Sequence, residues 1–294
     1  ERFGFRSSFV RLEDLTPFFA PLPESRLLTS WFALEPRGDL RGVDLLLERN
    51  ADARIDYAVT SEFAGLGLAT FEGAPGFTGI TGQVRADSRT GRLELASTRA
   101  TLDWQALFRG VLDVPELRGT VVWRTGQDAV RVVSDDLLVV TPAASLRSNL
   151  ELTLPMDGSS PELDLRTSIS GFDMAAVPTY VPARKMPTGV VRWLDDALRG
   201  GRALGAEVVF IGPVRAFPFD AGEGEFRATV RLADLKLGFV RDWPPAEDLD
   251  GTVEFINASF AGSGSGRVLG LSTEDVRVGI ADLRTGEFTL ATTT

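Results

Sequence analysis

Strict alternation of apolar and polar residues recurs along this chain and is clearest between Glu225 and Leu232. Successive side chains of a β-strand point to opposite faces, so alternation predicts strands with one apolar and one polar face. In this segment Phe226, Ala228 and Val230 project to one side. The same pattern returns at 43–47, 55–59, 80–86, 149–154, 163–169, 276–280 and 288–290. What so many one-sided strands bury is therefore the functional question.

Turn signals separate these runs and favour a mainly β fold. The 294 residues include 30 glycines and 16 prolines. Clusters of turn-forming residues occur at 36–39, 48–52, 73–76, 87–91, 125–128 and 157–161. Such spacings are typical of an antiparallel meander. We also expect an edge strand over residues 1–10.

A few short helices are expected beside the strands. Their predicted positions are 12–20, 101–108 and the proline-broken stretch 173–198, whose last part runs from Val190 to the glycines at 200–201. This stretch marks a bend near 173–201. No flexible linker divides the halves, so residues 1–294 are predicted to be one continuous segment.

Composition excludes several classes of function. A net charge of −10 disfavours nucleic acid and anionic headgroups, so any lipid contact must come from apolar burial. The chain has no cysteine and no histidine, which removes thiol nucleophiles, histidine triads and zinc sites. We predict no cofactor and no metal. No apolar run of about 18 residues occurs, so no helix spans a bilayer. Since the sequence starts at Glu1 without methionine, we interpret it as a fragment of a longer polypeptide.

A set of motifs in fixed order resembles a known family. The densest match lies in the second half of the chain, and its motifs in order are Ser160-Pro161-Glu162-Leu163-Asp164-Leu165, Tyr180-Val181-Pro182, Trp193-Leu194-Asp195-Asp196-Ala197-Leu198-Arg199-Gly200-Gly201, Gly212, Phe217-Pro218-Phe219, Gly222-Glu223-Gly224-Glu225-Phe226, Leu235 to Phe239, and Asp242-Trp243-Pro244. This combination is similar to the YhdP family of AsmA-like proteins. These are envelope proteins of Gram-negative bacteria, related in architecture to TamB.

The resemblance implies both a fold and a function. The fold would be mainly β: an elongated, twisted antiparallel sheet curled into an open hydrophobic groove, with a few short helices. The function would be transfer of phospholipid between the inner and outer membranes, without enzymatic activity. The protein would lie in the periplasm, held by an inner-membrane anchor outside this chain. Its partners would be phospholipid acyl chains, the inner membrane, and outer-membrane or envelope proteins. We expect the anchor and the remaining repeats of the family to lie outside this chain.

Under this interpretation the apolar positions of the strands would line the groove. The candidate groove residues are Leu150, Leu152, Leu154, Leu163, Leu165, Ile169, Val209, Ile211, Phe226, Val230, Val253, Phe255, Val278 and Ile280. Trp193, Phe217 and Phe219 are candidates for a gate at the groove edge. The competing interpretation for each position is ordinary packing under a helix or loop.

Two other classes of function stay open. The apolar faces could close on each other in a β-structured binding or scaffold module of the envelope that holds no lipid. The pairs Asp135-Asp136 and Asp195-Asp196 suggest a carboxylate glycosidase as an alternative function. Such an enzyme needs two carboxyl groups about 5–10 Å apart. Adjacent residues of a strand or helix point apart, so solvated surface charges are the better interpretation of both pairs.

Overall fold

A computed structural model describes residues 2–19, 26–50, 55–186, 188–238, 244–285 and 288–293. Strands make up most of these residues and the pairings between them are antiparallel, which confirms the predicted mainly β class with a few short helices. The chain divides into two compact units. Unit 1 comprises Glu1–Ala106, Gly110–Pro142 and Thr153–Asp157, and unit 2 comprises Leu107–Arg109, Ala143–Leu152 and Gly158–Thr294.

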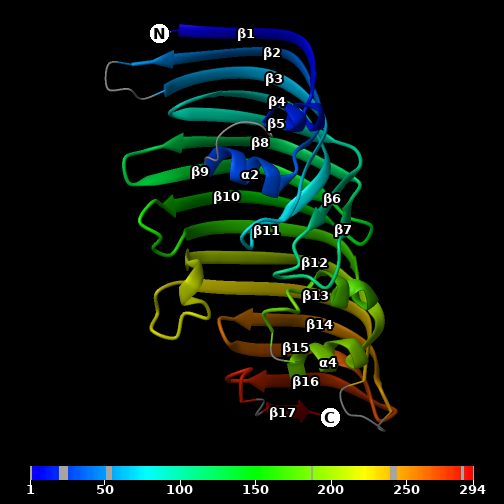
Figure 1. Cartoon of the computed structure of the whole chain (residues 1–294). Coiled ribbons are helices and arrows are strands. Elements are labelled where there is room, and N and C mark those ends of the chain that lie inside the picture. Colours follow the sequence, from blue (N-terminus) through cyan, green and yellow to red (C-terminus); the bar gives the residue numbers. More distant parts are fainter. Residues whose placement is uncertain are drawn as a thin grey trace. The chain divides into compact units, whose positions relative to one another are not determined.

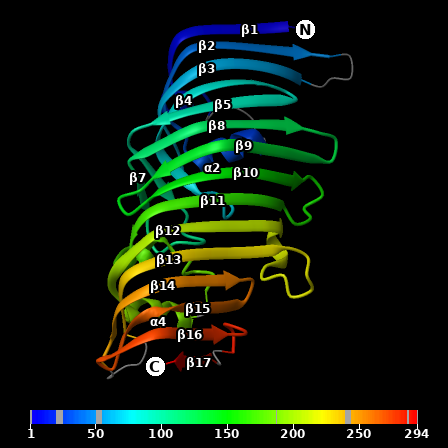
Figure 2. The same cartoon turned by 180° about the vertical axis from the view of Figure 1, so that it is seen from behind.

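Unit 1 is an antiparallel sheet whose strands follow one another in the order of the chain (Figures 1 and 2). Its strands are β1 (Arg2–Arg11), β2 (Arg37–Arg49), β3 (Ile55–Leu68), β4 (Gly76–Asp87), β5 (Thr90–Ser97), β6 (Ala100–Asp103), β7 (Leu112–Val114), β8 (Glu116–Thr125) and β9 (Ala129–Val140). The short strands β6 and β7 form a side branch, because β6 pairs with the far end of β4 while β5 pairs directly with β8. A 3-10 turn, η1 (Glu13–Leu15), and two helices, α1 (Thr16–Phe19) and α2 (Arg26–Leu34), join β1 to β2.

Unit 2 is also built from antiparallel strands that follow one another in the order of the chain. Its strands are β10 (Ser145–Pro155), which ends in residues of unit 1, β11 (Glu162–Asp173), β12 (Leu198–Pro213), β13 (Glu225–Leu237), β14 (Ala246–Ile256), β15 (Ser259–Val268), β16 (Leu271–Ile280) and β17 (Phe288–Thr293). From β11 to β17 each strand pairs with the next in antiparallel register. The short helical elements are η2 (Met174–Ala176), α3 (Val177–Tyr180), α4 (Thr188–Ala197) and η3 (Val214–Ala216).

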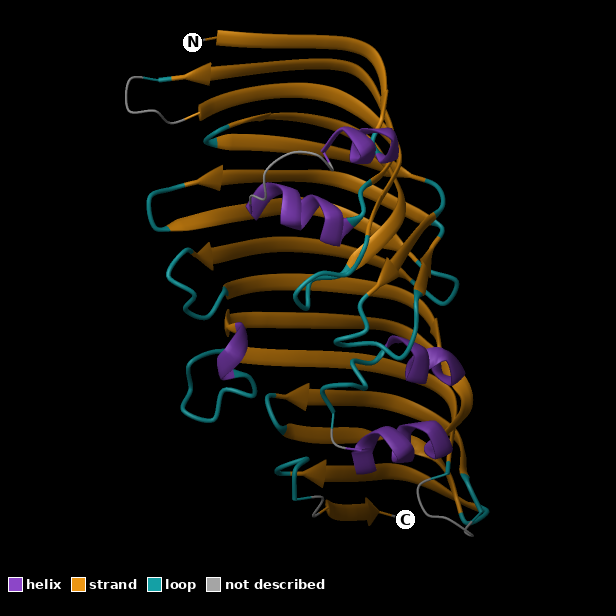
Figure 3. Ribbon diagram, in the orientation of Figure 1, coloured by secondary structure: helices purple, strands orange, loops and turns teal. Residues whose placement is uncertain are grey.

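Helices lie on one side of the sheet in each unit (Figure 3). In unit 1, α2 is drawn in front of the strands in Figure 1 and behind them in Figure 2, and α4 shows the same relation to the strands of unit 2. In the described parts of the chain, no helix is both long enough and apolar enough to cross a membrane.

The sequence prediction failed for two local elements. Residues 101–108 are not a helix: Ala100–Asp103 form β6, in which Leu102 pairs with Phe77 of β4 and Leu112 of β7. One turn of three-to-four spacing could not outweigh these long-range ladders, since a single helical turn is barely stable alone. Helix α2 was not predicted, although its start at Arg26 follows the prolines at 21 and 23.

Each unit has its own small apolar core at one end of its strands. In unit 1, Phe63, Ile80, Ala100 and Val114 are buried together, so the side branch of β6 and β7 supplies half of this core. In unit 2, Met174 of η2 is buried with three strand residues, namely Ala203, Leu232 and Leu235. Both cores leave long stretches of strand outside them.

One ion-pair fork fixes a loop of unit 2 and predicts a pH dependence. Arg284 donates to Asp220 through two nitrogens, at 2.8 and 3.0 Å, and to Asp282 at 2.7 Å. The Arg284 side chain and backbone N–H lower the pKa of Asp282 to about 2. A lowered folded-state pKa stabilises the fold above the unfolded value of 3.8, and this contribution is lost as pH falls toward about 2.

The variant Arg284→Gln removes most of that linkage. We expect it to melt at a lower temperature than the unmodified chain near neutral pH, and the difference to shrink steadily below pH about 4. Thermal unfolding by circular dichroism across this range measures the effect. A difference that stays constant down to pH about 2 would contradict it.

Candidate functional site

The register of unit 2 collects apolar residues into continuous rows across its strands. One row runs from β11 to β16 through directly paired positions: Ile169, Ala206, Val230, Val253, Gly262 and Val278. The neighbouring row contains Thr167, Val208, Ala228, Phe255, Phe260 and Ile280. Paired residues of adjacent strands share a face, so these rows form one apolar surface, which we call the unit 2 apolar face.

Most of the predicted groove residues lie on this face. Leu163 and Leu165 belong to it because they pair with Gly212 and Phe210 in the row beyond Val208. On β10 the hydroxyl of Ser148 lies 2.9 Å from that of Thr167, which puts the even-numbered residues of β10 on the same side. Leu150 and Leu152 follow at this parity, and Leu154 continues it into the part of β10 that belongs to unit 1.

Two predicted residues, Val209 and Ile211, lie on the opposite face. Val209 is paired with Arg166 and Arg227, and Ile211 with Asp164 and Glu225. Between Val208 and Ile211 every residue is apolar, so alternation cannot tell which parity faces inward. The register shows that Val208 and Phe210 are the members that share the apolar face.

The candidate residues are not sealed under a second layer of protein. None of the fourteen is buried: thirteen are half-buried, and Leu154 has 38% of its surface exposed. Val253 and Val278 close over Gly262, where a Cβ atom would lie 2.9 Å from Val278 Cγ1. The strands therefore pack side chains against their lateral neighbours and leave the outer part of the apolar face accessible.

The opposite face of unit 2 is charged and solvated. Arg227 bridges Glu225 at 3.0 Å and Glu254 at 3.2 Å, and Ser168 donates to Glu207 at 2.8 Å. The sheet is thus amphipathic across its thickness, as the alternation predicted.

Two of the three predicted gate residues belong to an aromatic cluster. The rings of Phe217 and Phe219 lie 5.8 Å apart, and both contact Phe210, at 6.0 and 5.2 Å between ring centres. Phe226 lies 5.6 Å from Phe217. Only 3% of Phe219 is exposed, whereas 48% of Phe217 is.

Gly212 and Gly224 leave room for the buried ring of Phe219 to pack against the sheet. A Cβ at residue 224 would lie 2.7 Å from Phe219 Cε1, and one at residue 212 would lie 3.2 Å from the same atom. The loop between β12 and β13 therefore folds back over the apolar face at this end of the two strands.

The other end of these strands is covered differently. Met174 and Val177 pack with Leu232 and Leu235, and Phe172 meets Tyr180 edge-on at 5.8 Å. Trp193, the third predicted gate residue, lies on α4 with 43% of its surface exposed. Helix α4 ends at Ala197, and Leu198 is the first residue of β12, where it packs against the same core.

Unit 1 carries an apolar face of its own, which the list of candidate residues did not include. Its central row consists of directly paired positions on β1 to β9: Phe5, Leu45, Val59, Ala86, Gly91, Trp123 and Val132. Trp123 lies over Gly91, where any Cβ would overlap its ring. Phe3, with 59% of its surface exposed, extends the face along β1. The alternation at 43–47 and 55–59 is the sequence signal that identifies it.

The two carboxylate pairs belong to different elements, one in each unit. Asp135 and Asp136 are successive residues of β9, and Asp195 and Asp196 are successive residues of α4. Asp195 forms an ion pair with Arg109 at 2.8 Å. Of the family motifs, Asp242 and Trp243 fall outside the described residues.

Comparisons with known proteins agree with this geometry. The YhdP protein family model matches residues 1–293. The chain is 25% identical over 246 residues to the intermembrane phospholipid transporter YhdP of Escherichia coli K12, an alignment that covers 84% of this chain and 19% of that protein. It therefore spans about a fifth of the length of this curated relative. No solved structure matches the chain. A family match over nearly its whole length, on a chain built of one-sided antiparallel strands, means that this chain belongs to the YhdP family.

Proposed function

We propose that the chain is one segment of an intermembrane conduit for phospholipid, and that acyl chains run along its apolar faces. The proposal rests on one observation: the apolar face of unit 2 is continuous from strand to strand and is also accessible. Apolar rows cross β11 to β16 without a charged residue, yet none of the predicted groove residues is buried. Hydrocarbon tails would complete the burial that a second sheet supplies in a sandwich.

Elementary energetics favours lipid as the occupant. Each methylene removed from water contributes about 0.8 kcal/mol, so an acyl chain gains from an accessible apolar surface without any specific pocket. Headgroups stay in water, because burying an unpaired charge or polar group costs several kcal/mol. A face with few polar groups does not bind any single lipid tightly. Weak binding of this kind is required if lipid is to move along the sheet.

The remaining parts of the proposal follow from the family. The relative in E. coli is named an intermembrane phospholipid transporter, which supports phospholipid as cargo and a role without catalysis. We place the chain in the periplasm of a Gram-negative bacterium, within a longer protein anchored in the inner membrane. Its contacts with the outer membrane or with envelope proteins belong to the rest of that protein.

Site-specific crosslinking to lipid tests the proposal. The chain is expressed in the periplasm of E. coli with a photoreactive amino acid at Leu165 on the apolar face, or at Arg166, the next residue, on the charged face. We expect crosslinked phospholipid from position 165 and none from position 166. Native mass spectrometry of the unmodified chain should show the same lipid before any crosslinking.

The same experiment decides against the closed scaffold. A binding or scaffold module with its faces shut would yield no lipid at either position. Equal crosslinking at both positions would show that lipid does not distinguish the two faces, and the conduit would be wrong in that case as well.

A further inference from the structure

The loop between β12 and β13, residues 214–224, is held at three places. Its first part is hydrogen-bonded to the loop before β11, where the backbone N–H of Val214 donates to the carbonyl of Pro161 at 2.9 Å. Its middle part carries the two rings of the aromatic cluster that fold back over the apolar face. Its last part forms an ion pair with the loop between β16 and β17. The loop is therefore a flap that is attached along its first part and closed by one ion pair on its far side.

The ion pair that closes this loop joins residues far apart in the sequence. Arg284 donates to both carboxylate oxygens of Asp220, from Nη1 at 2.8 Å and from Nη2 at 3.0 Å. Two parallel N–H donors on one carboxylate form a stronger contact than a single donor does. Asp282, in the same loop as Arg284, accepts from its Nε at 2.9 Å. The arginine is thus oriented by its own loop, independently of its contact with Asp220.

The arginine side of this contact rests on a fixed frame. The backbone N–H of Leu283 donates to the carbonyl of Ala258 at 2.8 Å, which ties the β16–β17 loop to the β14–β15 turn. That turn is tied to the start of β13, because the N–H of Phe226 donates to Asn257 Oδ1 at 2.8 Å. The loops after β12, β14 and β16 lie at the same end of the unit 2 strands (Figure 1). If the ion pair opens, the β12–β13 loop is therefore the part that moves.

The rings of this loop occupy a place that hydrocarbon could take. Phe217 and Phe219 lie against Phe210 and Phe226, which are directly paired on the unit 2 apolar face. An acyl chain that displaced the two rings would restore apolar burial over the same residues. Opening the loop would thus exchange one apolar cover for another. The ion pair is the contact that this exchange does not replace, so it favours the closed loop.

We propose that the β12–β13 loop is a side gate through which acyl chains enter or leave the unit 2 apolar face, and that the ion pair between Asp220 and Arg284 is its latch. Two glycines, Gly222 with a φ of 80° and Gly224, lie between the latch and β13. Their backbone freedom permits the change of direction that opening needs. The proposal rests on the conduit proposed above and adds a place where lipid crosses its edge.

Covalent locking of the latch tests the proposal. The chain contains no cysteine, so two introduced thiols are the sole targets of a thiol-specific crosslinker. The variant Asp220→Cys/Arg284→Cys removes the ion pair, and a short bis-maleimide then joins the two loops covalently. The measurement is the rate at which the chain takes up fluorescent phosphatidylethanolamine from phosphatidylcholine vesicles. One variant therefore gives both the unlatched and the locked state, and Arg284→Gln gives the unlatched state a second time.

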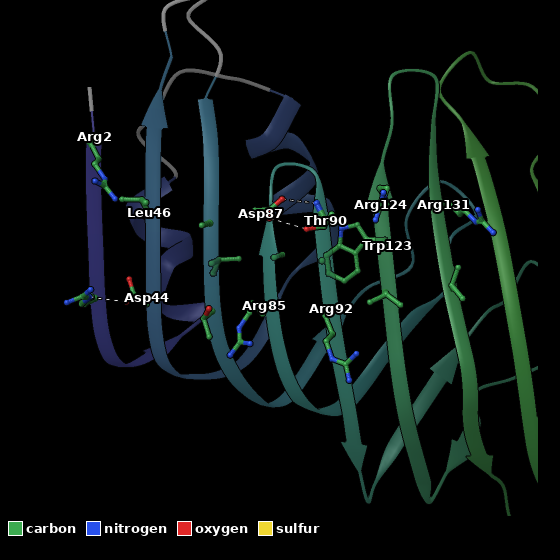
Figure 4. A pocket seen from close by; sticks show the side chains of 18 residues that line it. Arg2, Asp44, Leu46, Arg85, Asp87, Thr90, Arg92, Trp123, Arg124 and Arg131 are labelled. Carbon is green, nitrogen blue, oxygen red and sulfur yellow. Dashed lines mark hydrogen bonds and ion pairs between the residues drawn. The ribbon is translucent and has the colours of Figure 1, made fainter.

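The matched control is Arg6→Cys/Asp44→Cys in unit 1, where Figure 4 shows the ion pair at Asp44. Arg6 and Asp44 also form an exposed ion pair, at 3.0 Å, and they are directly opposite each other on β1 and β2. Crosslinking these positions joins two strands that are already hydrogen-bonded to each other. We therefore expect the same rate of lipid uptake before and after the control crosslink.

Both unlatched variants should take up lipid about three to five times faster than the unmodified chain, because an exposed ion pair no longer favours the closed loop. The crosslink between positions 220 and 284 should slow uptake below the rate of the unmodified chain. Equal rates before and after this crosslink, or equal slowing in the control, overturn the gate and leave the conduit standing. If no form of the chain takes up lipid, the conduit is wrong and the gate falls with it.

Discussion

Replacing Leu165 by aspartate is expected to abolish the retention of phospholipid while the chain stays folded. Leu165 is half-buried on the unit 2 apolar face, opposite Phe210, and it belongs to neither apolar core. A carboxylate there would have to lose water wherever an acyl chain passes, at a cost of several kcal/mol. Native mass spectrometry and crosslinking from Phe226, two strands away, measure the loss.

The matched control is Val209→Asp on the neighbouring strand. Val209 has the same half-buried character but lies on the charged face, where Arg166 and Arg227 flank it. An aspartate at this position gains arginine neighbours, so both folding and lipid retention should persist. Loss of lipid in Val209→Asp together with full retention in Leu165→Asp would mean that the opposite face is the one that carries lipid.

Val230 belongs both to the apolar face and to the core of unit 2, so a substitution there has a different expected effect from one at Leu165. Val230 shares the apolar face, but it also packs against the core of Met174, Ala203, Leu232 and Leu235. Both Val230 and Leu165 are groove candidates in the sequence, which by itself would give Val230→Asp and Leu165→Asp the same outcome. The packing instead leads us to expect that Val230→Asp lowers the free energy of unfolding, so only Leu165→Asp is a clean test of lipid contact.

The alternation predicted the strands well. It failed to predict the inward-facing side where successive residues are all apolar. From Glu225 to Leu232 the polar residues leave one choice of inner face, and the register agrees with it. Between Val208 and Ile211 both parities are apolar, and only pairing with β11 and β13 decides between them. Parity is a local property of a strand, whereas the choice of face depends on its neighbours.

The pairing of strands that are distant in the sequence could not be predicted from local patterns either. The opposition of Arg85 to Arg92 follows from the short turn at 88–89, but bringing Arg124 beside them requires β8 to pair with β5 past the excursion of β6 and β7. The residues of that excursion resembled a helix. An error there hid the core around Ala100.

The aromatic cluster gives the second large effect. Truncating Phe219 to alanine should lower the free energy of unfolding by about 3–5 kcal/mol, because a buried ring is removed from a well-packed site and a cavity is left. Phe217→Ala is the control, since about half of that ring is already exposed and the expected loss is much smaller. Urea denaturation monitored by circular dichroism compares the two.

The backbone at Phe219 sharpens this prediction. Its φ of 66° lies in the left-handed region that favours glycine, so the ring must hold the loop there against a local cost of about 1 kcal/mol or more. Alanine loses the ring and keeps that cost, whereas glycine loses the ring and relieves it. Phe219→Gly should therefore be no less stable than Phe219→Ala, the reverse of the usual order within structured backbone. If alanine proves clearly the more stable of the two, then the ring does not hold the loop in this conformation, and the fold-back of the β12–β13 loop over the apolar face would have to be fixed by other contacts.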